Sequence, residues 1–491
     1  MAVAEEGDAG PAWRKPAGFA LGLIAFFAIL LTPPPPGLDE IGWRVAGGAL
    51  LMAIWWLTEA LPVAVTALVP LILFPALGVM TAKVTASAYG DPLIFLFLGG
   101  FLIAAAIERW GLHQRIATRV LSLAGGRPSL IVLGFFSVAA FLSLWVSNTA
   151  TAAMLVPVGL STLRAFDPPG DGGSITKGLS NFRAATLLAI AYGATIGGVG
   201  TLIGTPPNAL FAAYARDELG QEVSFLGWMG IGLPVAVIMV PIAWLWLTRV
   251  AFPLKGVARL HTGPSADGPK PKPQPFSQPE ILTAAVFLLT ALLWVTRPLY
   301  QNVIPGWRIG DTEVALFGAL LLFILPSGRL GTPPLLDWSV TTRLPWGTLI
   351  LFGGGLALAE AIENSGLAAW LGRGLAGLEG VPTIVLVIAL AAIVIGLSEL
   401  ASNTAIAAIF LPLVGAAAGG LGENATALAV PAVLAASLAF MMPVGTPPNA
   451  IVFCTGQVSI GQMARAGLAL NVIGLVVIVL IGYPLALLIL G

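Results

Sequence analysis

Apolar segments long enough to cross a lipid bilayer recur from one end of this chain to the other. Four examples are Ala17–Leu31, Gly230–Leu247, Ile281–Val295 and Leu468–Leu490. About twenty apolar residues in a helix span the hydrocarbon core of a bilayer. Because backbone N–H and C=O groups find no water there, they must be satisfied within the protein. The pattern predicts an all-α polytopic membrane protein with the lipid bilayer as a partner.

Composition agrees with this prediction and excludes other classes. Of the 491 residues, 57% are hydrophobic and 9% are charged, whereas a soluble domain carries about a quarter charged residues. The formal net charge of zero gives no basis for binding nucleic acid. The single cysteine, Cys454, excludes an internal disulfide and a multi-cysteine metal site.

The placement of charges predicts a topology. We predict about eleven transmembrane helices plus two interrupted apolar stretches. Basic residues collect in alternate loops if the N-terminus is cytoplasmic and the C-terminus lies outside. No small-residue cleavage site follows the first apolar segment, so we expect a spanning helix there and not a signal peptide. The predicted location is the cell inner (plasma) membrane, as a multi-pass protein.

The two halves of the chain contain the same motifs in the same order, on either side of a polar segment (253–278) rich in Pro and Lys. Ser-Asn-Thr at 147–149 is matched by Ser-Asn-Thr at 402–404, and Gly-Thr-Pro-Pro-Asn at 204–208 is matched at 445–449. The predicted topology gives the two repeats opposite orientations. Inverted repeats with interrupted helices at matching positions are typical of secondary transporters, which bind their cargo near the midplane.

Each motif has a physical reason to interrupt a helix. A Pro-Pro pair removes backbone donors and clashes with the preceding turn. Ser-Asn-Thr flanked by helix formers is an N-cap sequence, which predicts a re-entrant hairpin whose second helix begins at the tip. The helix N-termini that meet at two such tips and two broken helices present free amide groups and partial positive charge, which suits an anion.

The charges missing from these segments predict a coupling cation. Residues 129–163, 184–215 and 381–464 contain no Lys, Arg or His. Burying a dianion there without a compensating charge costs on the order of several kcal/mol. A cation held by backbone carbonyl, Ser hydroxyl and Asn amide oxygens removes this cost, and such hard ligands suit sodium. We therefore predict Na⁺ as the coupling ion and no organic cofactor.

Glu399 is the acidic residue of the motif segments, apart from Glu423 in a loop. An intramembrane carboxylate is a functional candidate, and three roles are open: ligand of a second cation, proton carrier, or hydrogen-bond acceptor that rigidifies the hairpin. An enzyme is not predicted, because His113 and His261 lie outside the motifs and a Ser nucleophile would have only Glu399 as a base. An ion channel would need a continuous pore with charged or carbonyl rings.

The paired motifs, together with LTEALPVAVTALVPLILFPALGV from Leu57 onward, resemble the divalent anion:sodium symporter family. Its members carry succinate, malate, fumarate, citrate or sulfate, and the resemblance covers nearly the whole chain. It implies a homodimer that works by an elevator mechanism. The implied scaffold domain comprises residues 14–127 and 279–380, and the implied transport domain comprises residues 128–252 and 381–491. The segment 253–278 is expected to be a cytoplasmic linker.

The resemblance also implies binding residues at matching motif positions. The first sodium site would use Ser143, Ser147, Asn148 and the backbone of Gly204. The second sodium site would use Ser398, Ala401, Asn403 and the backbone of Gly445. The substrate would contact Ser147, Asn148, Thr149, Thr205, Ser402, Asn403, Thr404, Thr446 and Pro447. Some relatives carry threonine in place of Ser398 or alanine in place of Gly445, and both changes keep the ligand oxygen.

The sequence therefore predicts a sodium-coupled symporter of C4-dicarboxylates (succinate, malate, fumarate) or of related di- and tricarboxylates such as citrate. Two alternatives with the same fold stay open. One is a sodium-independent dicarboxylate antiporter, because some family members exchange dicarboxylates without sodium. The other is a sodium:sulfate symporter.

Overall fold

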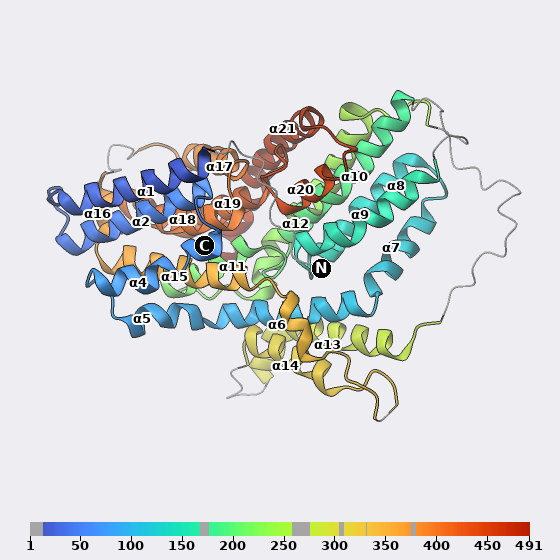
Figure 1. Ribbon diagram of the computed structural model, residues 1–491, viewed down its shortest axis with the longest axis horizontal. Coiled ribbons are helices and arrows are strands. Elements are labelled where there is room, and N and C mark those ends of the chain that lie inside the picture. The colour runs from blue at the N-terminus through green and yellow to red at the C-terminus, as the bar shows by residue number, and fades with distance from the viewer. Residues whose placement is uncertain (1–12, 167–175, 258–274, 304–308, 330, 375–379) are drawn as a thin grey trace, which may run out of the picture.

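The computed structural model is helical throughout the residues that it describes, which are 13–166, 176–257, 275–303, 309–329, 331–374 and 380–491 (Figure 1). The extended pairing in these ranges is a single bridge between Pro326 and Pro334. Eight of the described helices are long and apolar enough to cross a membrane. The predicted all-α polytopic fold is confirmed, whereas the count of about eleven crossings stays a prediction. Residues 258–274 of the predicted linker lie outside the described residues.

The first half of the chain forms the helices of the first repeat. They are α1 (Arg14–Leu31), α2 (Glu40–Thr58), α3 (Val63–Thr66), α4 (Val69–Ala76), α5 (Ala82–Ser87), the 3₁₀ turn η1 (Ala88–Gly90), α6 (Pro92–Arg109), α7 (Leu112–Leu123), α8 (Pro128–Ser143), α9 (Asn148–Arg164), α10 (Lys177–Gly198), α11 (Pro206–Asp217), α12 (Phe225–Leu245) and the π-helical turn η2 (Trp246–Ala251).

The second half forms the helices of the second repeat. They are α13 (Gln278–Val303), α14 (Asp311–Ile324), the 3₁₀ turn η4 (Trp338–Arg343), α15 (Trp346–Asn364), α16 (Leu367–Gly374), α17 (Thr383–Ser398), α18 (Asn403–Leu421), α19 (Ala425–Ser437), α20 (Pro447–Phe453), α21 (Ile460–Val477), the π-helical turn η6 (Ile478–Gly482) and α22 (Tyr483–Leu490).

Both Ser-Asn-Thr motifs lie at the tip of a helical hairpin, and the second helix begins at the motif as predicted. In the first hairpin α8 ends at Ser143 and α9 begins at Asn148, where the Ser147 hydroxyl accepts a 3.3 Å hydrogen bond from the Ala150 N–H. In the second hairpin α18 begins at Asn403, after Ser402. The hairpins α8–α9 and α17–α18 lie on opposite sides of the middle of the molecule in Figure 1.

Both Pro-Pro motifs restart a helix after a break. The chain leaves α10 at Gly198 and resumes a helix, α11, at Pro206; it leaves α19 at Ser437 and resumes a helix, α20, at Pro447. Proline is tolerated at these first helical positions, where its missing N–H has no helical partner to lose. The two broken helices therefore match in position, as the internal repeat predicts.

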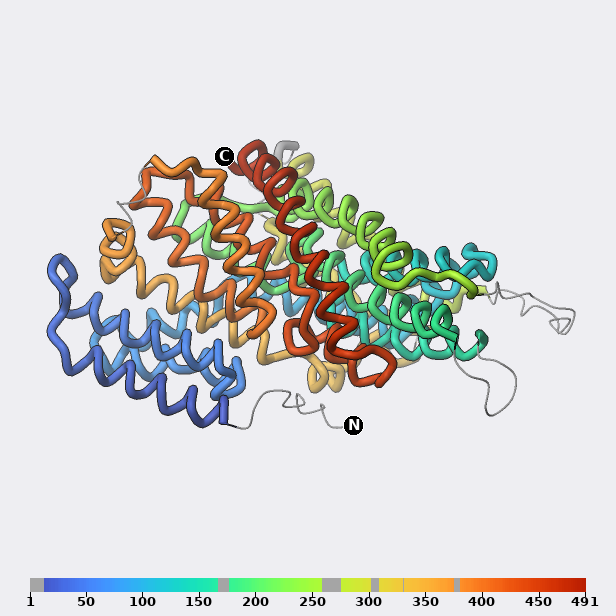
Figure 2. The backbone as a smooth tube through the Cα atoms, turned by 90° about the horizontal axis from the view of Figure 1, so that it is seen from above, coloured from blue at the N-terminus to red at the C-terminus, as the bar shows by residue number. Residues whose placement is uncertain are grey.

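The hairpins and broken helices of the two repeats are packed against each other. Within each repeat α8 packs against α10 and α17 packs against α19. Between repeats α9 contacts α20 and α11 contacts α18. Each hairpin therefore lies beside the resumed helix of the other repeat. In Figure 2 the C-terminal helices cross the middle of the molecule, while the α1–α2 pair lies at one edge.

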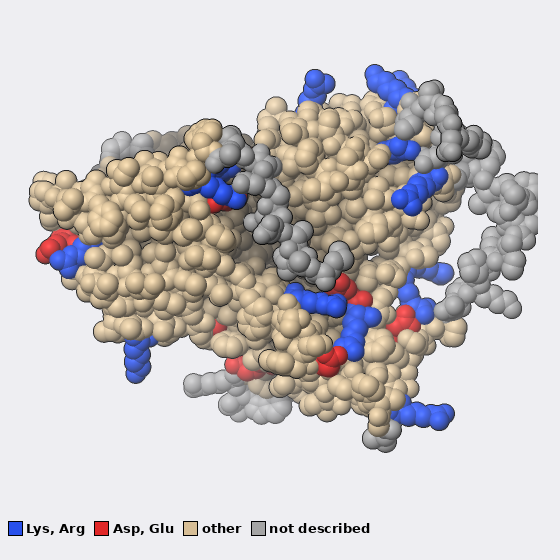
Figure 3. Space-filling model, viewed as in Figure 1, with Lys and Arg blue, Asp and Glu red and all other residues tan. Residues whose placement is uncertain are grey.

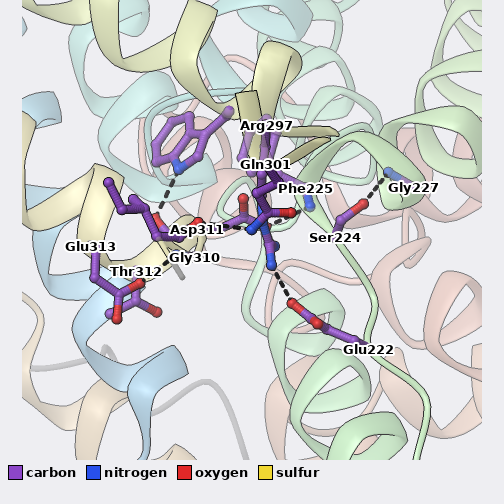
Figure 4. A network of polar contacts seen from close by, with 12 residues as sticks. Glu222, Ser224, Phe225, Gly227, Arg297, Gln301, Gly310, Asp311, Thr312 and Glu313 are labelled. Atoms are coloured by element: carbon purple, nitrogen blue, oxygen red, sulfur yellow. Dashed lines mark hydrogen bonds and ion pairs between the residues drawn. The ribbon is translucent and has the colours of Figure 1, made fainter. Parts of the chain in front are cut away.

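A buried polar network joins the start of α12 to α13 and α14 (Figure 4). Asp311 Oδ2 accepts a 2.8 Å hydrogen bond from the Phe225 N–H and lies 3.1 Å from Arg297 Nη1. Arg297 also pairs with Glu222. The Phe225 ring stacks on Trp294 at a centroid distance of 4.5 Å. Because the Arg297 and Asp311 side chains are only 11% and 8% exposed, the ion pair is largely removed from solvent.

The face shown in Figure 3 suits a lipid environment, because its charged side chains stand in small separate groups on a largely uncharged surface. Many large apolar side chains are mostly exposed, among them Ile72 (75% exposed) and Leu488 (80% exposed). Exposed apolar area of this extent is typical of a surface that contacts lipid or another protein.

Gly197 is required for the close approach of α10 to α8. A Cβ atom at Gly197 would lie 2.1 Å from the Ala140 carbonyl oxygen, whereas a Cβ atom at Gly396 on α17 would meet open space. We expect Gly197→Ala to lower the free energy of unfolding by about 1–3 kcal/mol through overpacking. Thermal unfolding in detergent should show a lower Tm for Gly197→Ala and no decrease for the control Gly396→Ala. Equal Tm values for the two variants would contradict this packing.

Candidate functional site

The side-chain amide of Asn148 lies among three oxygen atoms at the first break. One end of the amide is 2.6 Å from Ser143 Oγ, 3.0 Å from the Ala194 carbonyl and 3.2 Å from the Gly204 carbonyl. With its nitrogen at this end, the amide donates hydrogen bonds to these oxygens. With its oxygen there, the Ser143 hydroxyl donates to it, while the Ala194 and Gly204 carbonyl oxygens face the amide oxygen without a donor, and a cation would relieve their repulsion. The structure thus brings together three residues predicted for the first sodium site.

The Ala194 carbonyl was missed at the sequence level. Ala194 lies in α10 before the break and has no polar side chain of its own that would draw attention to it. Its carbonyl lies one turn before the end of α10 at Gly198, next to the last four carbonyls, which have no N–H partner within the helix. The sequence signal that could have pointed to it is the position of the break, because the carbonyls near the end of α10 are candidate sodium ligands.

Ser147 is the fourth residue predicted for the first sodium site, and it lies at the N-cap of α9. Its hydroxyl oxygen accepts the 3.3 Å hydrogen bond from the Ala150 N–H. Its hydroxyl proton stays available for a further acceptor, such as a substrate carboxylate. Thr149 follows within the first turn of α9. These residues therefore share the hairpin tip with Asn148.

The second hairpin tip contains buried oxygens without partners. Ser398 Oγ and Asn403 Oδ1 are buried, and neither has a hydrogen-bond partner among the described residues. An unsatisfied buried polar atom costs about 1–3 kcal/mol, and contact with a cation would remove this cost for either oxygen. Ala401 is fully buried nearby in the chain. The predicted second sodium site therefore has oxygens that fit a cation.

Glu399 joins the second hairpin to the break between α19 and α20. Its carboxylate accepts hydrogen bonds from the backbone N–H groups of Phe440 (2.7 Å), Met441 (2.9 and 3.0 Å) and Met442 (2.8 Å). The Asn471 side-chain amide donates a further bond of 2.7 Å. Both carboxylate oxygens are thus occupied by donors. Of the three roles that the sequence leaves open for Glu399, these contacts display that of hydrogen-bond acceptor.

The first repeat satisfies the matching position differently. Leu144 stands where the second repeat has Glu399, and its backbone carbonyl accepts a hydrogen bond from the Thr201 hydroxyl. A neutral contact therefore fastens the first hairpin to its broken helix, and a carboxylate fastens the second. The second half of the site consequently contains a carboxyl group at a position where the first half has a leucine.

Thr205 and Thr446 start the two resumed helices with nearly the same backbone conformation. Their φ and ψ angles are −141° and 141° for Thr205 and −142° and 146° for Thr446. Both are 2% exposed. The hydroxyl of Thr446 accepts a 3.4 Å hydrogen bond from the Asn449 N–H, and Pro447 is the first residue of α20.

The remaining predicted substrate residues lie on the second hairpin. Ser402 precedes α18, and Asn403 and Thr404 form its first turn. Because α9 contacts α20 and α11 contacts α18, the tip residues of each repeat lie in helices that pack beside the Thr-Pro-Pro-Asn helix of the other. Among the described residues, no group of three His, Cys, Asp or Glu side chains could hold a metal. The oxygen atoms at the breaks that could contact a cation therefore belong to hydroxyl, amide and carbonyl groups, apart from the Glu399 carboxyl group.

Paired hairpins and broken helices, interlocked within a helical membrane protein, define the class of secondary transporters with internal repeats. Residues 15–490 match the family model described as the sodium:sulfate symporter transmembrane region. The chain belongs to this family, and the family resemblance of its motifs is confirmed. Family membership implies sodium as the coupling ion.

Two bacterial relatives match the chain over most of its length. The sodium-dependent dicarboxylate transporter SdcS of Staphylococcus saprophyticus is 40% identical over 476 residues, which are 95% of this chain and 90% of that protein. The protein of the same name from Staphylococcus aureus strain MRSA252 is 40% identical over 484 residues, which are 96% of this chain and 92% of that protein.

Two solved structures share the fold at low sequence identity. The YdaH transporter of Alcanivorax borkumensis has a TM-score of 0.52 at 15% identity and covers 97% of this chain and 96% of its own. MtrF of Neisseria gonorrhoeae has a TM-score of 0.54 at 14% identity with the same coverage. These similarities support the helical transporter fold.

Replacing Glu399 tests its hydrogen bonds to the broken helix. Glu399→Gln keeps the shape but turns one acceptor into a donor that faces backbone N–H groups. Hydrogen bonds to a charged group contribute about 1.5–3 kcal/mol, so we expect a lower Tm and faster hydrogen exchange at residues 440–442. The control is Glu423→Gln, because the described contact of the Glu423 carboxylate is a 2.7 Å bond from the Thr383 hydroxyl, away from the break. Wild-type exchange at 440–442 in Glu399→Gln would contradict this role.

Proposed function

We propose that the chain is a secondary transporter that carries C4-dicarboxylates, such as succinate, malate and fumarate, together with sodium across the cell inner membrane. The observation that carries this proposal is the convergence of Asn148 with the oxygens of Ser143, Ala194 and Gly204. This polar cluster lies in a region without basic residues, where a dianion needs a cation. Two relatives that are 40% identical to the chain are named sodium-dependent dicarboxylate transporters.

Each hairpin asparagine couples sodium to substrate in this proposal. An amide carries its oxygen and its nitrogen at opposite corners of one rigid plane. When the Asn148 oxygen turns to sodium at the break, the amide nitrogen turns away and becomes a donor for a substrate carboxylate. Asn403 acts in the same way at the second site. Sodium binding therefore creates the donors that the anion needs.

The proposed ligand sets follow the two repeats. Sodium binds Ser143, Ser147, Asn148 and the Gly204 carbonyl in the first, and Ser398, Ala401, Asn403 and the Gly445 carbonyl in the second. The dicarboxylate binds Ser147, Asn148, Thr149, Thr205, Ser402, Asn403, Thr404, Thr446 and Pro447. Sodium offsets the charge of the substrate, so that the loaded site crosses the membrane at a lower electrostatic cost.

We further propose an elevator motion in a homodimer, with the N-terminus cytoplasmic and the C-terminus outside. The moving domain comprises residues 128–252 and 381–491, and the scaffold comprises residues 14–127 and 279–380. Several arginine contacts join the two. Arg14 donates 2.7 Å hydrogen bonds to the carbonyls of Leu57 and Leu400, and Arg216 pairs with Asp91. These contacts must rearrange when the moving domain slides.

Uptake by the reconstituted protein tests the proposed transport. We expect proteoliposomes to accumulate radiolabelled succinate under an inward sodium gradient and to lose accumulation when potassium replaces sodium. Uptake that ignores sodium but requires dicarboxylate inside the vesicles would identify an antiporter and contradict symport. Sodium-driven uptake of sulfate without succinate uptake would contradict the dicarboxylate assignment. Empty vesicles are the control.

Truncating the hairpin asparagines tests the shared site. We expect Asn148→Ala and Asn403→Ala each to raise the half-saturating concentrations of sodium and of succinate together, by about tenfold or more, because each amide is proposed to serve both. Uptake assays at varied sodium and succinate concentrations measure both values. A variant with a changed value for one solute and an unchanged value for the other would refute the coupling by that amide.

A further inference from the structure

The last residue of the first Gly-Thr-Pro-Pro-Asn motif fastens the break between α10 and α11. Asn208 is fully buried. Its amide nitrogen donates hydrogen bonds to the carbonyls of Gly198 (3.1 Å), Val199 (3.3 Å) and Thr201 (2.7 Å). A helix end leaves its last carbonyls without partners, and inside a membrane water cannot supply them. This side chain therefore contacts three carbonyls that the break exposes, and the Trp228 indole N–H donates a further 2.9 Å bond to the Val199 carbonyl.

The second repeat contains the same contact. Asn449 is fully buried, and its amide nitrogen donates a 3.0 Å hydrogen bond to the Met442 carbonyl. Met442 precedes Gly445 by three residues, as Thr201 precedes Gly204. The contact between the motif asparagine and this carbonyl is therefore common to both repeats, although the two loops differ in sequence.

The fold of the first loop is tight enough to need such a fastening. A Cβ atom at Gly204 would lie 2.4 Å from the Gly198 carbonyl and 2.8 Å from the Ser143 carbonyl. The loop thus turns back on the end of α10 and presents the Gly204 carbonyl to Asn148, 3.2 Å away. If the loop opened, this carbonyl would leave the oxygen cluster.

We propose that Asn208 and Asn449 are positioning residues for the two sodium sites. Asn208 keeps its loop closed so that the Gly204 carbonyl faces Asn148, Asn449 holds the matching loop before Gly445, and neither is proposed as a ligand. This inference rests on the proposed sodium coupling. According to this inference, sodium affinity depends in part on Asn208 and Asn449, which contact the loops of their own broken helices and not the ion.

The two positioning residues differ in how far the closed form of their loops depends on them. Asn208 ties three carbonyls, and the carboxylate position of the second repeat is occupied by Leu144 in the first. Asn449 ties one carbonyl, and Glu399 holds three N–H groups of the same loop. Loss of Asn449 therefore leaves the second loop held by Glu399. Loss of Asn208 removes three contacts of the first loop and leaves only neutral side-chain ones among the described residues, from the Trp228 indole and the Thr201 hydroxyl.

Asn208→Asp is the sharpest test, because it keeps the shape and replaces the donating nitrogen with an oxygen that faces carbonyls. The control is Asn181→Asp on α10, where the amide donates a 3.0 Å bond to the Pro253 carbonyl. At about 1.5 Å rise per residue, position 181 lies roughly 25 Å from the end of α10. Full-length protein is compared in proteoliposomes and in detergent.

We expect Asn208→Asp to raise the sodium concentration for half-maximal succinate uptake by about tenfold, Asn449→Asp by about threefold, and Asn181→Asp not at all. The increase in Tm on adding sodium chloride in place of potassium chloride should shrink in the same order. Without sodium, amides 199–205 should exchange hydrogen faster in Asn208→Asp than in the wild type.

An unchanged sodium response in Asn208→Asp, or a loss of maximal rate alone, would overturn the proposal. If Asn208→Asp does not fold, the double variant Asn449→Asp with Glu399→Gln tests the proposal in the second loop. We expect the double variant to lose more sodium response than the two single variants added together, because each side chain holds the loop when the other is changed. A loss equal to the sum of the two single losses would overturn the proposal. A wild type without any sodium response would refute the proposed function, while the sodium-free exchange of 199–205 still decides whether Asn208 closes the loop.

Discussion

The structure depends on satisfying the backbone where two helices are broken inside the membrane. Each break releases carbonyls and N–H groups that have no water to bind, and unsatisfied groups cost about 1–3 kcal/mol each. Asn208, Asn449 and Glu399 supply partners for these groups at the two breaks. The carbonyl of Gly204 instead faces Asn148 at 3.2 Å, so the same break that threatens stability also leaves an oxygen for a cation.

The two repeats solve this problem with groups of opposite character. In the first, a neutral amide ties carbonyl oxygens together. In the second, a carboxylate ties N–H groups together. Because a carboxyl group lies beside only the second break, the two proposed cation sites differ in their polar surroundings even though their motifs are the same. An internal repeat therefore does not imply two equal sites.

Much of this could be predicted from the sequence, because the motifs have strong local consequences. Ser-Asn-Thr predicts the hairpin tips, Pro-Pro predicts the restarted helices, and their order predicts the internal repeat. The contacts of Glu399 could not be predicted, because its partners are backbone groups and Asn471, whose position depends on packing far along the chain. The Ala194 carbonyl was equally hidden, since it becomes a candidate ligand only when the end of α10 is known.

The central claim is that the hairpin asparagine and the broken helix hold a sodium ion. Electron cryomicroscopy of the wild-type protein in sodium, and again in choline, tests it most directly. The account predicts density in sodium among Asn148, Ser143 and the Gly204 carbonyl, with the amide oxygen turned inward, and no such density in choline. The same cluster without ion density at a sodium concentration that saturates uptake would contradict it.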